Sequence, residues 1–190
     1  EIAAAKVKIW ARPLSHRVEC FGYRIEEADG VRMLPDKLAE RAVRGSDIKK
    51  LQQSGTIVVG GKTISIGEVS VPRLGQKLAV VMDSRPCAQA VELARGVDVL
   101  VSEATFTREH EEEAHAFAHM TAAQAAQIAV QAQARKLVLT HFSQRYTSTA
   151  GHVAEAAAIF PDVVAAEDFA RVAVPPRLEE SESGSVGLAP

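Results

Sequence analysis

Four short runs of apolar, largely β-branched residues each lead into a histidine or a carboxylate. The runs and the residues that follow them are 6–14 with His16, 77–82 with Asp83, 97–102 with Glu103, and 136–140 with His141. Runs of this kind are typical of buried strands, and α/β folds bind ligands at the carboxyl ends of their strands. The pattern predicts an α/β sheet with a metal site assembled from strand ends. For His141 alone, a strand-end histidine beside a polar turn is an equal alternative.

The remaining pattern predicts further strands and helices around this sheet. We expect strands over 21–26 and 163–166, a hairpin over 56–66 that turns at Gly60-Gly61, an extended piece over 171–174, and helices over 86–94, 121–134 and from 147 or 148 to 160. Thr121 is the expected N-cap of the Ala-rich second helix, and His119 lies just before it. The Glu- and His-rich residues 108–115 could bind a metal, but a solvated active-site loop is the favoured interpretation.

Residues 27–55 have a different character, with many charges, few apolar residues, and two short helices expected over 35–44 and 48–53. An irregular connection of this length is unusual in a compact domain, which favours a protruding arm with a function. An ordinary solvated loop is the alternative. From residue 175 onward the chain is rich in Pro, Glu, Ser and Gly, and we expect 175–190 to be a disordered tail.

Composition restricts the class of protein. The chain has 190 residues, of which 47% are hydrophobic and 24% charged, as expected for one globular domain. Its net charge of -2 argues against a broadly basic nucleic-acid surface, and two cysteines are too few for a disulfide framework. No apolar run could span a membrane and no signal peptide is present, so a cytoplasmic protein is expected. The start at Glu1 rather than Met suggests a recombinant product, a processed product or a piece of a longer chain.

Five segments together resemble the ribonuclease Z (tRNase Z) branch of the metallo-β-lactamase fold, over about residues 9–169. In family order, P-L-S-H at 13–16 and C-F-G-Y at 20–23 resemble the family's P-L-x-H and C-x-G-Y, and M-D-S-R-P at 82–86 resembles G-D-T-x-P. S-E-A-T-F at 102–106 resembles H-E-A-T-F, H-M-T-A at 119–122 resembles H-S-T-A, and T-H-F-S-Q-R-Y at 140–146 resembles T-H-F-S-x-R-Y. The resemblance implies the second half of an αββα sandwich. We therefore expect one metallo-β-lactamase-like domain over 1–174, with 27–55 as an inserted arm.

The resemblance also implies a site with two zinc ions, in which His16 binds one ion, His141 binds the other, and Asp83 bridges them. His119 would protonate the leaving 3′ oxygen, and Glu103 would orient His119. Ser143 and Arg145 would contact a substrate phosphate, although a structural salt bridge is an equal alternative for Arg145. The implied activity is hydrolytic removal of 3′ trailers from precursor tRNA. A homodimer is expected, in which the arm of one subunit serves the site of the other.

This sequence departs from the family pattern in three places. It has only six histidines and lacks the H-x-H-x-D-H motif that supplies most zinc ligands in the family, so it resembles the C-terminal portion alone. Where the family has G-D-T, this sequence has Met82-Asp83-Ser84, and where the family has H-E-A-T, residues 102–105 are Ser-Glu-Ala-Thr. A Gly-Pro element of the family's arm is replaced by Ser46-Asp47. The arm keeps basic residues suited to phosphate contacts, namely Arg32, Lys37, Arg41, Arg44, Lys49 and Lys50. Two other functions stay open: hydrolysis of a small phosphodiester, and a non-catalytic fragment with an incomplete metal site.

Overall fold

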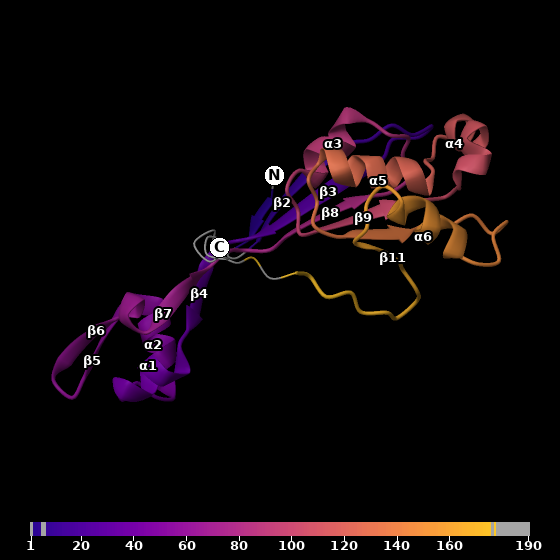
Figure 1. Cartoon of the computed structure of the whole chain (residues 1–190). Helices are drawn as coiled ribbons and strands as arrows, with labels where there is room; N and C mark the ends of the chain where they lie inside the picture. The colour runs from indigo at the N-terminus through magenta and orange to yellow at the C-terminus, as the bar shows by residue number, and fades with distance from the viewer. Residues whose placement is uncertain (1, 5–6, 176, 178–190) are drawn as a thin grey trace, which may run out of the picture. The chain divides into compact units, whose positions relative to one another are not determined.

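The structure is a computed structural model that describes residues 2–4, 7–175 and 177. Most of the tail expected over 175–190 lies outside the described residues. The described chain forms two compact units, shown in Figure 1. We call residues 2–28 with 76–175 the sheet unit, and residues 29–75 the inserted unit, with which Arg177 is grouped.

The sheet unit is built on a seven-stranded sheet of order β1-β2-β3-β8-β9-β10-β11. Its strands are β1 (Ile2–Ala4), β2 (Val7–Pro13), β3 (Phe21–Glu27), β8 (Lys77–Val81), β9 (Val99–Glu103), β10 (Leu137–Thr140) and β11 (Val163–Ala165). The strands from β1 to β8 pair antiparallel, and those from β8 to β11 pair parallel. Parallel strands place their carboxyl ends at one edge, so the residues that follow β8, β9 and β10 meet there.

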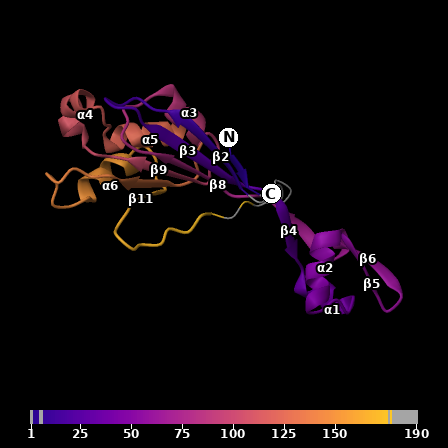
Figure 2. The same ribbon diagram turned by 180° about the vertical axis from the view of Figure 1, so that it is seen from behind.

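Three helices, α3 (Ala88–Ala94), α5 (Ala122–Gln131) and α6 (Ala150–Ala157), lie on one face of this sheet, as both ribbon views show (Figures 1 and 2). The small side chains of α5 allow close approach to the sheet, and four of its alanines are fully buried in the core that contains Leu100 and Leu137, namely Ala122, Ala125, Ala126 and Ala129. Thr121 caps α5 as expected: its side chain accepts from the Gln124 amide, and the Gln124 side chain accepts from the Thr121 amide. Within the described chain, no helix is long and apolar enough to cross a membrane.

The opposite face of the sheet is apolar and carries no described helix. Val80, Val101 and Val138 pair side by side across β8, β9 and β10. They lie on this face because side chains alternate along a strand, and the residues next to them, such as Ala79, Leu100 and Leu137, pack in the core under the helices. Tyr23 of β3 pairs with Val80 of β8, and the Tyr23 side chain is 45% exposed. This is the face on which an αββα sandwich places its second sheet.

Several element boundaries differ from the sequence-based expectation. Residues 108–115, expected as a loop, lie in the 3₁₀ helix η2 (Arg108–His110) and the helix α4 (Glu111–Phe117). The helix expected from residue 86 begins at Ala88, since Cys87 is its extended N-cap, and the helix expected from 147 or 148 begins at Ala150. Residues 171–174 form no strand. The short strands β1 and β4 (Gly30–Met33) were not expected.

The inserted unit has a hydrophobic core of its own. It contains β4, α1 (Pro35–Glu40), α2 (Ser46–Ser54), the hairpin β5 (Thr56–Val59) and β6 (Lys62–Ser65), the 3₁₀ helix η1 (Ile66–Glu68), and β7 (Ser70–Arg73), which pairs antiparallel with β4. Leu38, Val43 and Leu51 from the helical part pack with Ile64 and Val69. Because Ile64 of the hairpin and Val69, just before β7, complete this core, the compact unit continues to residue 75 rather than ending at residue 55.

Candidate metal centre

The strand ends bring most of the expected site residues into contact. Asp83 follows β8 and His141 follows β10, and the Asp83 Oδ1 atom lies 3.0 Å from His141 Nε2. Glu103 ends β9, and its Oε1 atom lies 3.0 Å from His119 Nδ1. The His119 ring centroid is 5.1 Å from that of His16 and 5.2 Å from that of His141. The structure therefore places all five residues expected as metal ligands or catalytic groups at one edge of the sheet.

Glu103 is fully buried, and its carboxylate accepts four hydrogen bonds. Oε1 accepts from the Ser84 amide at 2.5 Å and from His119. Oε2 accepts from the Thr105 hydroxyl at 2.7 Å and from the Met120 amide at 3.1 Å. A buried carboxylate is stable only when such donors replace water. Because one donor is the amide next to Asp83, the same carboxylate also fixes the position of that residue.

Each site histidine has its Nδ1 atom in a hydrogen bond. Thr105 Oγ1 donates to Glu103 and therefore accepts from His141 Nδ1 at 2.8 Å. His16 Nδ1 donates to the Ala118 carbonyl at 2.9 Å, and His119 Nδ1 donates to Glu103. With Nδ1 used in this way, each imidazole directs Nε2 away from its hydrogen-bond partner. This arrangement fixes tautomer and ring orientation as metal ligands require.

Two of these residues adopt a strained backbone. Asp83 has φ 50° and His141 has φ 57°, in the left-handed region that side-chain-bearing residues rarely adopt. Strain of this kind persists only where surrounding contacts over-determine it. Here the Cys20 thiol donates to the Asp83 carbonyl at 3.1 Å, and burial raises the pKa of that thiol, which keeps it protonated as a donor. The sharp turns after β8 and β10 aim both side chains at each other.

The donor set fits a divalent metal. Among the described residues, the group that could hold an ion consists of Asp83, His119 and His141, whose ligand atoms all lie within 4.8 Å of one another. His16 lies beside this group rather than within it. Imidazole and carboxylate ligands suit zinc and several other divalent ions. The geometry thus offers His119 as a ligand as well as an acid.

The two residues expected to bind a phosphate are engaged within the chain. The Arg145 Nη1 atom donates to Glu113 Oε2 at 2.9 Å, and its guanidinium lies 4.8 Å from the centre of the Phe106 ring. The Ser143 amide donates to the Thr105 carbonyl at 3.1 Å, so this turn is tied to the end of β9. Arg145 therefore makes the salt bridge that the sequence left as an alternative.

Sequence reasoning did not assign a role to Thr105, the one side chain that links Glu103 to His141. Its position two residues after Glu103 in extended chain was the available signal, because alternate residues share a side. The roles of the Ser84 and Met120 amides and of the Ala118 carbonyl carry no signal in the sequence. Backbone groups are used here irrespective of side-chain identity.

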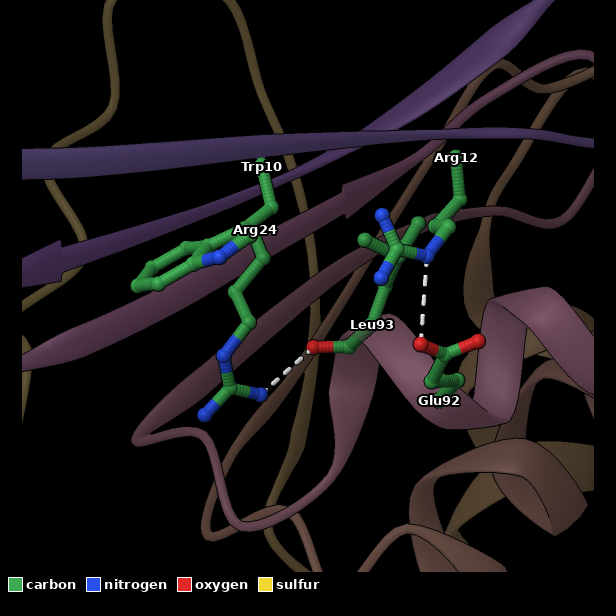
Figure 3. A pocket seen from close by; sticks show the side chains of 5 residues that line it. All are labelled: Trp10, Arg12, Arg24, Glu92 and Leu93. Atoms are coloured by element: carbon green, nitrogen blue, oxygen red, sulfur yellow. Dashed lines mark hydrogen bonds and ion pairs between the residues drawn. The ribbon is translucent and has the colours of Figure 1, made fainter. Parts of the chain in front are cut away.

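A pocket lies away from this edge, between the middle of β2 and β3 and helix α3 (Figure 3). It is lined by Trp10, Arg12, Arg24, Glu92 and Leu93. Arg24 donates to the Leu93 carbonyl at 2.7 Å, and Arg12 pairs with Glu92 at 3.1 Å. These two contacts attach α3 to the sheet.

The chain is similar to a set of ribonuclease Z sequences and to the metallo-β-lactamase fold. Residues 53–142 match a family described as a beta-lactamase superfamily domain. The sequence is 51% identical to Ribonuclease Z of Nocardia farcinica over 174 residues, covering 91% of this chain and 57% of the relative. It is 46% identical to Ribonuclease Z of Thermobifida fusca, covering 90% of this chain and 55% of the relative. The chain spans about half the length of the curated relatives it matches.

Two solved structures support the fold. Human tRNase Z, short form, superposes with a TM-score of 0.53 at 23% identity, over 92% of this chain and 46% of that one. The metallo-beta-lactamase fold protein YhfI of Bacillus subtilis superposes with a TM-score of 0.55 at 18% identity, over 86% of this chain and 47% of that one. The chain therefore has the metallo-β-lactamase fold. Its particular resemblance, predicted from five motifs, is to ribonuclease Z, and the sequence relatives confirm it.

Thr105→Val should destabilise the sheet unit and loosen the site. The variant keeps the shape of the side chain but removes one of the two donors to Glu103 Oε2 and leaves His141 Nδ1 without its partner, which costs about 1–3 kcal/mol. Chemical denaturation measures the loss, and Thr63→Val, at an exposed position of β6, is the control expected to change little. Equal stability of the Thr105 variant and the wild type would show that the hydroxyl is not the link.

His152 predicts a pH dependence of stability. It is fully buried in α6 between Tyr146 and Phe142, at ring-centroid distances of 4.5 and 5.0 Å, and neither ring nitrogen has a hydrogen-bond partner among the described residues. Burial lowers its pKa from the ordinary value of 6.5. The stabilisation is therefore complete above pH 6.5 and is lost as the pH falls toward the folded-state pKa, because the unfolded state binds the proton first. His152→Phe should flatten this acid limb in urea titrations, and parallel curves for both proteins would contradict the assignment.

Proposed function

We propose that this chain supplies the C-terminal part of a metal-dependent endoribonuclease that removes 3′ trailers from precursor tRNA. One observation carries the proposal: the buried Glu103 carboxylate orders Asp83, His119 and His141 around a single point at the strand-end edge. The ribonuclease Z relatives supply the reaction that fits this arrangement.

The proposed metal is zinc, two ions per complete site; His16 would hold one ion, His141 the other, and Asp83 would be a ligand to both. Since this chain offers few ligands for two ions, further ligands would come from a part of the protein outside it. Zinc supplies Lewis-acid activation of water and positive charge for the phosphodiester oxygens. The chain's own contribution is to aim the Nε2 atoms of the imidazoles and the Asp83 carboxylate from rigid strand ends.

His119 is the proposed general acid. Water adds to phosphorus and releases a proton to solvent, the bond from phosphorus to the 3′ oxygen breaks, and the His119 Nε2 proton passes to that oxygen; His119 is then reprotonated from solvent. Glu103 holds the opposite side of the ring through the 3.0 Å contact to Nδ1, which stabilises the protonated imidazole and fixes its direction. Ser143 and Arg145 would bind the phosphate, and Arg145 would exchange its Glu113 partner for it, since a guanidinium binds either anion through the same fork.

The inserted unit is the proposed grip on the body of the tRNA. Arg32, Lys37, Arg44 and Lys49 are exposed on it, whereas Arg41 pairs with Glu68 and Lys50 with Asp47. Lysine and arginine contacts to phosphates position a nucleic acid without reading its sequence. A homodimer whose inserted unit serves the partner's site, and a cytoplasmic location, complete the proposal.

The test is a hybrid enzyme in which this chain replaces the matching 174-residue region of the Nocardia farcinica relative. The hybrid should cleave precursor tRNA at its 3′ end. His119→Ala in the hybrid should lower kcat by about 10²- to 10⁴-fold, as expected for loss of a general acid, with metal content unchanged. His115→Ala, an exposed histidine of α4, is the matched control and should retain activity.

Two outcomes would revise this proposal. A His119→Ala hybrid that cleaves at the normal rate would remove the acid assignment. A variant that loses bound metal together with activity would make His119 a ligand, in line with its place beside Asp83 and His141.

Replacing residues 29–75 by an Asn-Gly turn should separate tRNA processing from phosphodiester hydrolysis. The β3 and β8 strands pair antiparallel, and Glu27 donates to the Gln76 carbonyl at 2.9 Å, so a two-residue hairpin turn can join them. The shortened hybrid should still hydrolyse a chromogenic phosphodiester but lose precursor cleavage by about 10²-fold or more, because several phosphate contacts are removed together. Unchanged precursor cleavage would favour a small phosphodiester as the natural substrate.

A further inference from the structure

Four planar groups lie one after another beside His119. Phe106 and Phe117 stack with ring centroids 6.4 Å apart and an interplanar angle of 15°. The Arg145 guanidinium lies 4.8 Å from the centre of the Phe106 ring, and the Arg17 guanidinium 5.5 Å from that of Phe117. The Phe106 ring is 6.3 Å from that of His119, between centroids. We call this series, from Arg17 through Phe117 and Phe106 to Arg145, the stacked column.

The outer aromatic ring of the stacked column is exposed but firmly held. Phe106 is 4% exposed, whereas Phe117 is 44% exposed. Phe117 ends α4, and Ala118 follows it in the left-handed conformation with its carbonyl bonded to His16. The His119 amide in turn donates to the Ala114 carbonyl at 2.8 Å. The ring is thus fixed two residues from the proposed acid, on a segment that has little freedom to bury it elsewhere.

The guanidinium at the same end of the column is available to a ligand. Arg17 directly follows His16 and is exposed, and its recorded contact within the described chain is the Phe117 ring. In the stacked column, Arg17 lies on the side of the Phe117 ring away from Phe106, so a base would replace the guanidinium there, and the displaced guanidinium can bond the neighbouring phosphate through its edge. Arg17 and Phe117 together therefore offer what an unpaired nucleotide presents, which is a flat base next to a phosphate.

The charges around α4 favour this end of the column for nucleic acid. Glu109, Glu111 and Glu112 are exposed near the start of α4, and Phe117 lies at its end. A polyanionic strand is repelled by the first group and attracted by Arg17. Arg108 is also exposed beside these glutamates, and the net charge of the four side chains is negative, which favours approach from the Phe117 side.

We propose that Phe117 and Arg17 form a stacking subsite for the unpaired nucleobase of the nucleotide that carries the leaving 3′ oxygen. The subsite rests on the proposed function, because it takes its position from His119 acting at that oxygen. Stacking on an aromatic ring accepts any base, since every base has a flat π-face. The subsite would therefore hold the end of the RNA in place without selecting its sequence.

The test uses the hybrid enzyme and two precursor RNAs that differ at one nucleotide. One RNA carries a normal base at the nucleotide with the leaving 3′ oxygen, and the other is abasic there. Phe117→Leu keeps an apolar side chain without the flat face and should lower kcat/KM on the normal RNA by about tenfold. Phe117→Trp keeps a flat aromatic face and should therefore retain the wild-type kcat/KM on the normal RNA. Phe169→Leu, at a fully exposed phenylalanine, is the matched control and should have no effect.

The combined experiment decides whether the ring acts through the base. The abasic RNA should be cleaved about tenfold more slowly by the wild-type hybrid, and Phe117→Leu should cause no further loss on it, because the two changes remove one contact. If the two losses multiply, or if Phe117→Leu cleaves the normal RNA at the wild-type rate, the subsite is overturned while the proposed function stands. That result would leave Phe117 as an apolar contact to another protein segment.

A binding readout separates failure of the subsite from failure of the proposed function. An RNA with 2-aminopurine at the same nucleotide should lose fluorescence on binding the hybrid, because stacking quenches this base, and should lose less with Phe117→Leu. If the hybrid cleaves neither RNA, the proposed function fails, and the quenching difference alone then supports or overturns the subsite.

Discussion

The buried carboxylate of Glu103 is the constraint on which the rest of the site depends. Its four donors come from the turn after β8, from Thr105, and from residues 119 and 120 before α5. Removing such a group from water is costly unless every donor is in place, so the carboxylate and its donors stabilise each other's positions. One side chain thereby joins the ends of two strands to the start of a helix, and through Thr105 it reaches the end of a third strand.

This constraint explains why unfavourable backbone conformations are tolerated around it. Asp83, Ala118 and His141 all have positive φ. The amide of Ser84, next to Asp83, donates to Glu103. The Ala118 carbonyl accepts from His16, and the His141 ring donates to Thr105. A positive φ at a residue with a side chain costs on the order of 1 kcal/mol or more. The alanine-rich core behind α5, which is almost completely buried, supplies the stability that offsets this cost.

The strand ends were predictable from the sequence because a buried strand is a local pattern, and the residue after it must emerge at the sheet edge. The order of five motifs identified the fold before any geometry was known. Features that depend on distant residues were not predictable. The inserted unit was expected to end at residue 55, since nothing local shows that Ile64 and Val69 complete a core with Leu38.

Helix α4 was missed for a related reason. Of its seven residues only Ala114 is buried, so it lacks the apolar periodicity by which helices are recognised, and its glutamates resemble a solvated loop. The pairing of Arg145 with Glu113 joins residues far apart in sequence, which left the role of Arg145 open between a phosphate contact and a salt bridge. The histidines, by contrast, were located at strand ends or a helix start, and their roles as ligands or acid remain predictions.

The way the chain enters and leaves the inserted unit has an evolutionary consequence. β3 and β8 are neighbours in the sheet, and at their ends Glu27 bonds Gln76, while β4 pairs with β7 and Asp29 accepts from the Gly75 amide at 2.8 Å. Both termini of the inserted unit thus emerge from adjacent, paired strands, and its core is its own. Such a segment can be gained, lost or exchanged by recombination at a single hairpin, so a protein of this fold could change the molecules it contacts without rebuilding the strand-end edge of its sheet.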